Sequence, residues 1–518
     1  MVWRFVNAQK DRRVVPATSI LLLLFISVIF SASPSGIVSL KHNTGRTLSM
    51  CWGESQFIIQ SFSREVSSGP LVLDDNQIWQ LESLRIHTGN ITLKGSSKLI
   101  INRGNLQMAG ENTTLLLQDY ASIEITEGGV LNSTVNFTLN ASGSSAIKLS
   151  GGYLGGINTS GRPALINFTL SGQAGLSAYN SSVYVKRLHS AEGGSIMLEN
   201  SSLSGMVFTS ESWSDSTVIN SSLNITDFNI TESLLGYSFL RIFNSSLFSQ
   251  NITLAGSFLF NNSSVNASRF LVVLPDDLET RPLAQLLNTT ILSTEFNICS
   301  SAYTEEEPVL PIDLPEIAIR NTTIKALLSR FSNVSIIFEN LSMIRQPSGS
   351  GDFINSENCS IAGLNLSCPS GNISLSNSSV ILSNSSIASL KAYTSSVRLS
   401  DSVCMNASFY NSSQGSVINC FKDSTSLNNS LNQTRYNPSF HTPVVADETS
   451  VCEVGNAVII TVVDNRSMPV ENAGITLRRH PYSGVGDYIA SGTTDIDGKV
   501  RLDAISGVWC GNTLMLTP

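Results

Sequence analysis

Residues 180–222 read NSSVYVKRLHSAEGGSIMLENSSLSGMVFTSESWSDSTVINSS, and the triplet Asn-Ser-Ser returns in them every 20 residues, first at Asn180. A second series of Asn-x-Ser/Thr triplets runs from Asn321 to Asn377 at intervals of 19, 18 and 19 residues. A fixed period near 20 indicates one short structural unit that is stacked many times. The repeat therefore predicts a long array of similar units.

Apolar and polar residues alternate in the segments outside the triplets, beginning at Leu71. The stretches LVLDDNQIWQLESLRI and NITLKGSSKLIINRGNLQM contain pairs such as Ile91 with Leu93 and Leu99 with Ile101, and Asn, Gly or Ser separates the runs. Alternation with a period of two predicts short strands. No window carries the 3.6-residue apolar stripe of an amphipathic helix.

Short strands with a period near 20 predict an all-β fold, a right-handed parallel β-helix over residues 71–435. Coils of two or three strands stack about 4.8 Å apart, so roughly eighteen coils form a rod about 80–90 Å long. Inward Leu, Ile and Val side chains form rows, and each coil is stable only against its neighbours. A β-sandwich or propeller usually contains Asn-Gly or Asp-Gly hairpin turns, which are nearly absent from this region.

Residues 1–36 have the composition of an export segment. Arg4 and Lys10 belong to a basic start, residues 17–30 are an apolar run, and small residues follow at 31–33. The run is shorter than the about 20 residues that span a bilayer. We predict a cleaved signal peptide, with a retained membrane anchor as the alternative, and residues 37–70 as an irregular lead-in or cap.

The C-terminal part changes character after a linker at residues 436–450. DNRSMPVENAGITL, followed by SGTTDIDGKVRLDAI, is similar to immunoglobulin-like modules of the carboxypeptidase-regulatory and bacterial-Ig type. The resemblance implies a small Ig-like β-sandwich over residues 451–518. Such modules usually contain one or two further strands, so an open edge suited to homotypic assembly is expected.

The composition excludes one class of partner and indicates another. Only 14% of the residues are charged and the net charge is −8, so nucleic acid is not an expected partner. Roughly thirty Asn-x-Ser/Thr triplets are potential N-glycan acceptors, and sugar in place of charge would keep the surface in water. Because Asn also suits left-handed bends, some of these residues are expected to stack inside the bends without modification.

We expect glycans at outward acceptor asparagines. The predicted sites are Asn90, Asn112, Asn132, Asn180, Asn200, Asn220, Asn244, Asn262, Asn321, Asn340, Asn377 and Asn411.

Eight cysteines follow the export segment, an even number that suggests disulfides in an oxidising environment. The expected local bridges are Cys359–Cys368, Cys404–Cys420 and Cys452–Cys510. The cysteine spacings and the scattered histidines lack the pattern of a zinc site, so no metal or cofactor is predicted.

Catalytic candidates are few. Glycoside hydrolysis needs two carboxylates about 5–10 Å apart, and the candidate pairs are Asp74 with Asp75 and Asp276 with Asp277. Asp74 and Asp75 lie in the first coil and are more simply a turn or cap, so Asp276 with Asp277, in a proline-flanked loop, is the pair to test. Trp213 and Tyr237 are the aromatic candidates for a carbohydrate-binding surface. No neighbouring His or Arg signature supports the aspartate candidates.

Residues 71–435 resemble the parallel β-helix surface proteins of archaea and bacteria, which have a pectate-lyase-like architecture, without a catalytic signature. The resemblance implies a secreted or cell-surface glycoprotein, a structural or adhesive component such as an S-layer-associated stalk. Cell-envelope proteins or polysaccharide are the expected partners. A polysaccharide lyase or hydrolase of the β-helix class and a carbohydrate-binding surface module are the alternatives, because this architecture serves several functions.

Overall fold

The computed structural model consists of β-strands and the turns that join them. It describes residues 36–41, 47–53, 56–62, 65–231, 238–275, 283–300, 314–347, 352–417, 421–428, 431–435, 444–446, 451–478, 488–510 and 513–516. These residues contain no helix, and hence none of the length and apolarity that a membrane span requires. The predicted export segment lies outside the described residues, apart from Gly36.

Each early coil contains three strands. In one of them β10 (Asn105–Met108) and β11 (Thr113–Leu117) belong to a first sheet, and β12 (Ser122–Thr126) belongs to a second sheet. β12 pairs in parallel with β9 (Lys98–Asn102) of the preceding coil, with Ile123 opposite Leu99. The polar groups of the backbone are therefore satisfied between coils.

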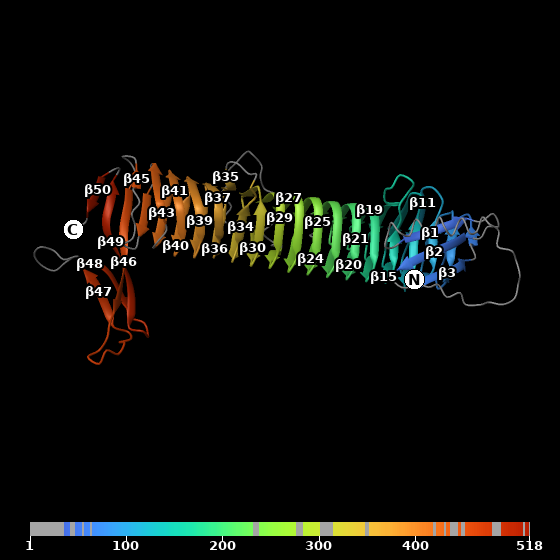
Figure 1. The fold of residues 1–518 in the computed structure, drawn as a ribbon, viewed down its shortest axis with the longest axis horizontal. Helices are drawn as coiled ribbons and strands as arrows, with labels where there is room; N and C mark the ends of the chain where they lie inside the picture. The colour runs from blue at the N-terminus through green and yellow to red at the C-terminus, as the bar shows by residue number, and fades with distance from the viewer. Residues whose placement is uncertain are drawn as a thin grey trace, which may run out of the picture.

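The parallel pairing continues along the whole rod. Seventeen successive strands of the second sheet lead from β6 (Ile78–Leu81) to β44 (Leu431–Arg435) in the described part of the chain, which corresponds to about 16 turns. Figure 1 shows the coils following one another along a single axis. The prediction of a parallel β-helix is confirmed, with slightly fewer turns than the eighteen expected.

The middle coils are simpler and contain two strands. β18 (Gly175–Tyr179) and β20 (Ser195–Glu199) belong to the second sheet, and the long strands β19 (Ser182–Ser190) and β21 (Ser202–Ser210) belong to the first. These are the coils with the 20-residue Asn-Ser-Ser period. One triplet therefore marks one corner of each coil.

Inward side chains form continuous apolar rows. Leu99, Ile123 and Ile147 are fully buried and lie opposite one another in successive coils. Aromatic residues stack in the same way, with the rings of Phe208 and Phe228 4.6 Å apart and nearly parallel. The side-chain rows predicted from the alternation are confirmed.

The N-terminal end differs from the expected irregular lead-in. β1 (Gly36–Lys41), β2 (Thr47–Gly53) and β3 (Gln56–Phe62) form a three-stranded antiparallel sheet. β4 (Glu65–Ser67) then pairs in parallel with β7 (Leu84–His87). The first coil thus begins a few residues before Leu71.

The C-terminal segment extends the second sheet. The start of β46 (Val451–Thr461) pairs in parallel with β44, and β46 also pairs antiparallel with β49 (Lys499–Cys510), which pairs with β50 (Thr513–Leu516). β47 (Gly474–Arg478) and β48 (Tyr488–Thr493) form a separate two-stranded hairpin that projects to one side in Figure 1. The Ig-like sandwich remains a prediction.

Candidate functional site

The asparagine of each Asn-Ser-Ser triplet turns the chain at a corner of the rod. Asn180, Asn200 and Asn220 have φ angles of 48°, 50° and 48°, and all three are exposed. Among residues with a side chain, asparagine adopts this left-handed conformation most readily because its short amide bonds locally. The conformation explains why asparagine recurs at this position.

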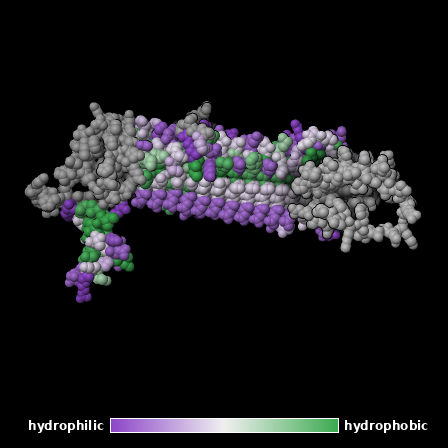
Figure 2. All heavy atoms as spheres, in the orientation of Figure 1, coloured by the Kyte–Doolittle hydropathy of each residue, from purple (hydrophilic) through white to green (hydrophobic). Residues whose placement is uncertain are grey.

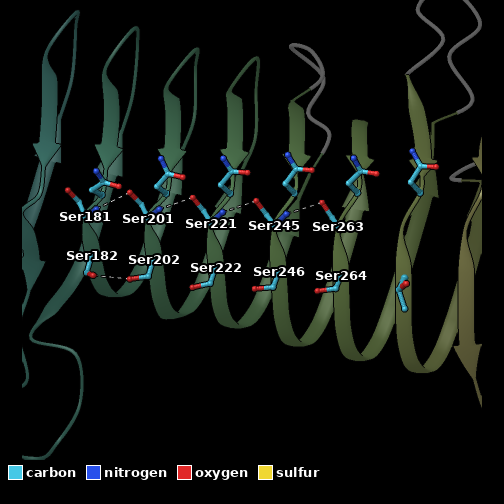
Figure 3. A pocket seen from close by; sticks show the side chains of 17 residues that line it. Ser181, Ser182, Ser201, Ser202, Ser221, Ser222, Ser245, Ser246, Ser263 and Ser264 are labelled. Carbon is cyan, nitrogen blue, oxygen red and sulfur yellow. Dashed lines mark hydrogen bonds between the residues drawn. The ribbon is translucent and has the colours of Figure 1, made fainter. Parts of the chain in front are cut away.

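The second residue of the triplet forms a buried ladder. The backbone N–H of Ser181 donates to Oγ of Ser201 at 3.1 Å, and the N–H of Ser201 donates to Oγ of Ser221 at 3.0 Å. Each hydroxyl in turn donates to the carbonyl two residues earlier, as Ser201 does to Glu199 at 2.7 Å. Figure 3 shows this chain of hydrogen bonds passing from coil to coil.

This serine has a role that the acceptor-site interpretation missed. An N-glycan acceptor leaves the middle position of the triplet free, yet serine recurs there. That recurrence was the available clue to the ladder. The ladder closes the corner by satisfying a backbone N–H in each of five successive coils, from Gly152 to Ser245.

The triplets of six coils together line a shallow groove of about 1030 Å³. Its lining contains only asparagine, serine and threonine, from Asn180 to Thr290, and therefore no titratable side chain. Figure 2 shows the hydrophilic residues as a continuous stripe along the rod. The groove offers neutral hydrogen-bonding groups and no acid–base pair.

The opposite corner acquires the same geometry further along the chain. Its left-handed residues are Asn333, Asn358, Asn377, Thr394 and Asn411.

The second sequence series thus mixes two corners. Asn321 and Asn340 lie at the first corner and are linked directly, since Nδ2 of Asn340 donates to Oδ1 of Asn321 at 2.7 Å. Asn358 follows Asn340 after the strands β34 (Ser342–Arg345) and β35 (Asp352–Glu357), at the other corner of the same coil. The 18-residue interval is therefore part of a coil, whereas the 19-residue intervals on either side are full coils.

The remaining predicted acceptors occupy different environments. Asn90, Asn112 and Asn411 are exposed at turns, as are Asn244 and Asn262 in the groove. Asn132 is half-buried within β13 (Val130–Ser133), where its Oδ1 is buried without a hydrogen-bond partner among the described residues.

The predicted bridge between Cys359 and Cys368 is wrong, because both residues are free and buried. Cys359 follows the left-handed Asn358 at one corner, whereas Cys368 belongs to β37 (Ser367–Ser376), which begins after the other corner. Cys359 takes the place of a ladder serine: its Sγ donates to the Glu357 carbonyl at 3.2 Å. Cys368 points into the apolar interior, in register with Ile387.

The other predicted bridges fall partly outside the described residues. Sγ of the buried Cys404 donates to the Asn406 carbonyl at 3.3 Å, and its expected partner Cys420 is not described. The backbone register places Cys452 opposite Trp509, one position from Cys510. The Cys404–Cys420 and Cys452–Cys510 bridges remain predictions.

Of the aspartate pair to test and the aromatic candidates, Trp213 alone lies among the residues that the structure describes. Asp276, Asp277 and Tyr237 lie outside the described residues. Trp213 is 65% exposed at the corner after β21, with a φ of 67°. Within the described ranges no three His, Cys, Asp or Glu side chains gather as a metal site would require.

Comparison with known proteins leaves the function open. No protein-family model matches the chain, and no curated protein matches it. A double mutant of the tailspike protein of E. coli bacteriophage HK620 is similar over 87% of this chain and 85% of that chain, at 10% sequence identity and a TM-score of 0.18. A likeness at this level says nothing about activity.

Proposed function

We propose that the chain is a secreted or cell-surface glycoprotein whose β-helix is a rigid structural or adhesive rod, such as an S-layer-associated stalk. The observation that carries the proposal is the row of exposed acceptor asparagines, one per coil, along a corner of the rod. Glycans attached there would extend outward and leave the apolar interior undisturbed. No covalent chemistry is assigned to the groove, because its lining lacks any acid or base.

Glycans also answer a problem of solubility. A chain with 14% charged residues has little charge to keep a long rod in water, against about 25% in ordinary soluble proteins. Large exposed apolar side chains such as Phe248 and Ile381 add to that problem. A sugar coat would mask them, and the C-terminal segment would then dock to cell-envelope proteins or polysaccharide.

The mass of the secreted protein tests the proposal. We expect an intact mass well above that of the polypeptide, which falls after enzymatic or chemical removal of N-glycans. Replacing Asn180, Asn220 and Asn262 by Gln is expected to lower the mass by the glycans at those sites, whereas Asn251→Gln in β25 (Ser246–Ala255) tests an acceptor away from the corner. A secreted product with the mass of the bare chain would contradict the proposal.

A further inference from the structure

A second hollow lies on the outer face of the first sheet, where three parallel strands meet. It has a volume of about 360 Å³ and is lined by β17 (Leu165–Leu170), β19 and β21. The strand register places Thr169 opposite His189, and His189 opposite Thr209. Asn167 and Arg187 precede Thr169 and His189 by two residues and line the same hollow. Three successive coils therefore present amide, hydroxyl and cationic groups side by side.

Arg187 is the unusual member of this group. It is exposed and makes no ion pair or side-chain hydrogen bond with any described residue. Two carboxylates on the following coils have other partners: Oε1 of Glu211 is 3.2 Å from Nε2 of His189, and Oδ1 of Asp227 accepts from Asn251 at 2.8 Å. In a chain with a net charge of −8, an unpaired guanidinium in a hollow whose lining has no acid suits an anion.

Trp213 supplies an exposed apolar surface at the corner after β21, four residues beyond the lining residue Thr209. It follows Glu211, the partner of His189, by two residues at the corner after β21. Both Ser212 and Trp213 have left-handed φ angles, 53° and 67°, which is rare for a bulky side chain. Asparagine is the usual left-handed corner residue of this rod, so an indole at this position, 65% exposed, is an exception to the structural pattern.

These observations together select the kind of ligand. The hollow is open and extends across coils about 4.8 Å apart, and its polar lining of Asn167, Thr169 and Thr209 suits a ligand with many hydroxyl groups. An exposed indole stacks well on the apolar face of a sugar ring. We infer that this hollow binds an acidic glycan, with Arg187 pairing its anionic group and Trp213 contacting a neighbouring sugar.

Calorimetric titration of the secreted protein tests the inference. The probes are an oligogalacturonate, which carries carboxylates, a heparin oligosaccharide, which also carries sulfates, and a neutral maltooligosaccharide. Arg187→Ala is expected to weaken binding of the anionic probe by roughly 10-fold or more, because a hydrogen bond to a charged group is lost. Arg187→Lys retains the positive charge but lacks the planar guanidinium group, so an intermediate loss of affinity is expected.

Matched variants separate a binding role from a structural one. Arg398→Ala removes another exposed arginine, on the second sheet in β40 (Ser396–Ser400), and is expected to bind as the unmodified protein does. Trp213→Phe is expected to retain most of the affinity that Trp213→Ala loses. Stronger binding of oligogalacturonate or of heparin identifies the anion as carboxylate or sulfate. Equal binding of the neutral probe, no binding of either anionic probe, or no effect of Arg187→Ala would overturn the inference.

Discussion

Cys359 and Cys368 are both buried thiols, yet their neighbours differ in kind. Cys359 occupies a serine position, with its N–H donating to Oγ of Ser378 at 3.2 Å and its Sγ donating to a carbonyl. We expect Cys359→Ser to change the free energy of unfolding by less than about 0.5 kcal/mol. Cys368→Ser places a hydroxyl among apolar side chains and is expected to cost about 1–3 kcal/mol. Urea unfolding of both variants measures the difference, and equal effects would contradict these assignments.

The same thiols predict a dependence of stability on alkaline pH. Burial raises the pKa of Cys359 to about 11 and that of Cys368 to about 12, from an ordinary value of 9. Well below pH 9 both thiols are protonated in the folded and unfolded chains, so their contribution is constant. As the pH rises from 9 toward 12, the unfolded chain releases protons first and folding is disfavoured.

The measurement compares midpoints of urea unfolding at pH 8 and pH 10.5. The unmodified protein is expected to lose more stability over this interval than a variant with both Cys359→Ser and Cys368→Ser. Identical losses would show that other groups, such as Tyr153 with its raised pKa, cause the whole effect.

Turns at the corners are the elements that decide how the coils close. Thr394 has a φ of 49° at a corner where Asn377 and Asn411 have 47°. A β-branched residue is strained in this conformation, by about 1–2 kcal/mol relative to glycine. We expect Thr394→Gly to stabilise the rod by about 0.5–1 kcal/mol, after the greater flexibility of the unfolded glycine is subtracted.

Asn377→Gly is the matched control for this element, because asparagine already tolerates the left-handed conformation. Its expected effect is smaller than about 0.5 kcal/mol in either direction. Both variants are compared by urea midpoint after removal of glycans. A destabilised Thr394→Gly variant would mean that the hydroxyl or methyl group contributes more than the strain costs.

The inward side-chain rows can be predicted from the sequence, whereas the corner that each triplet occupies cannot. Alternation in segments such as β9 predicts the inward rows, because the side-chain period of a strand is two. The period of the triplets predicts coils but cannot tell which corner a triplet occupies. Asn340 and Asn358 look like one more repeat, although two strands of the same coil separate them.

At the scale of the whole molecule, long-range placement is what the sequence leaves open. Even numbers of cysteines suggested local bridges, yet Cys359 and Cys368, nine positions apart, follow opposite corners because a coil reverses the chain between them. The hollow at Arg187 was likewise not predicted. Its lining comes from three strands, and only the coil register brings together Thr169, His189 and Thr209, which are 20 positions apart in the sequence.

If the corner asparagines carry N-glycans, as proposed above, the stacking of coils limits how many of them one rod can carry. Asn180, Asn200 and Asn220 occupy the same corner in three successive coils. Successive coils lie about 4.8 Å apart, which is less than the width of a hydrated sugar ring. Glycans on two adjacent coils would either collide or force the coils apart. Because of the coil spacing, we expect N-glycans on roughly every second asparagine along this corner.

A single tryptic peptide reports this exclusion, because residues 188–241 contain both Asn200 and Asn220 with no internal lysine or arginine. Mass spectrometry with site localisation is expected to find either asparagine modified, and rarely both. Asn200→Gln is expected to raise the occupancy of Asn180 and Asn220, because the coil between them can then carry no glycan at this corner. The glycan occupancy of Asn465, which lies outside this row of corner asparagines, is expected to stay the same. Frequent modification of both Asn200 and Asn220 in one peptide would mean that glycans leave the corner in divergent directions and that coil spacing sets no limit.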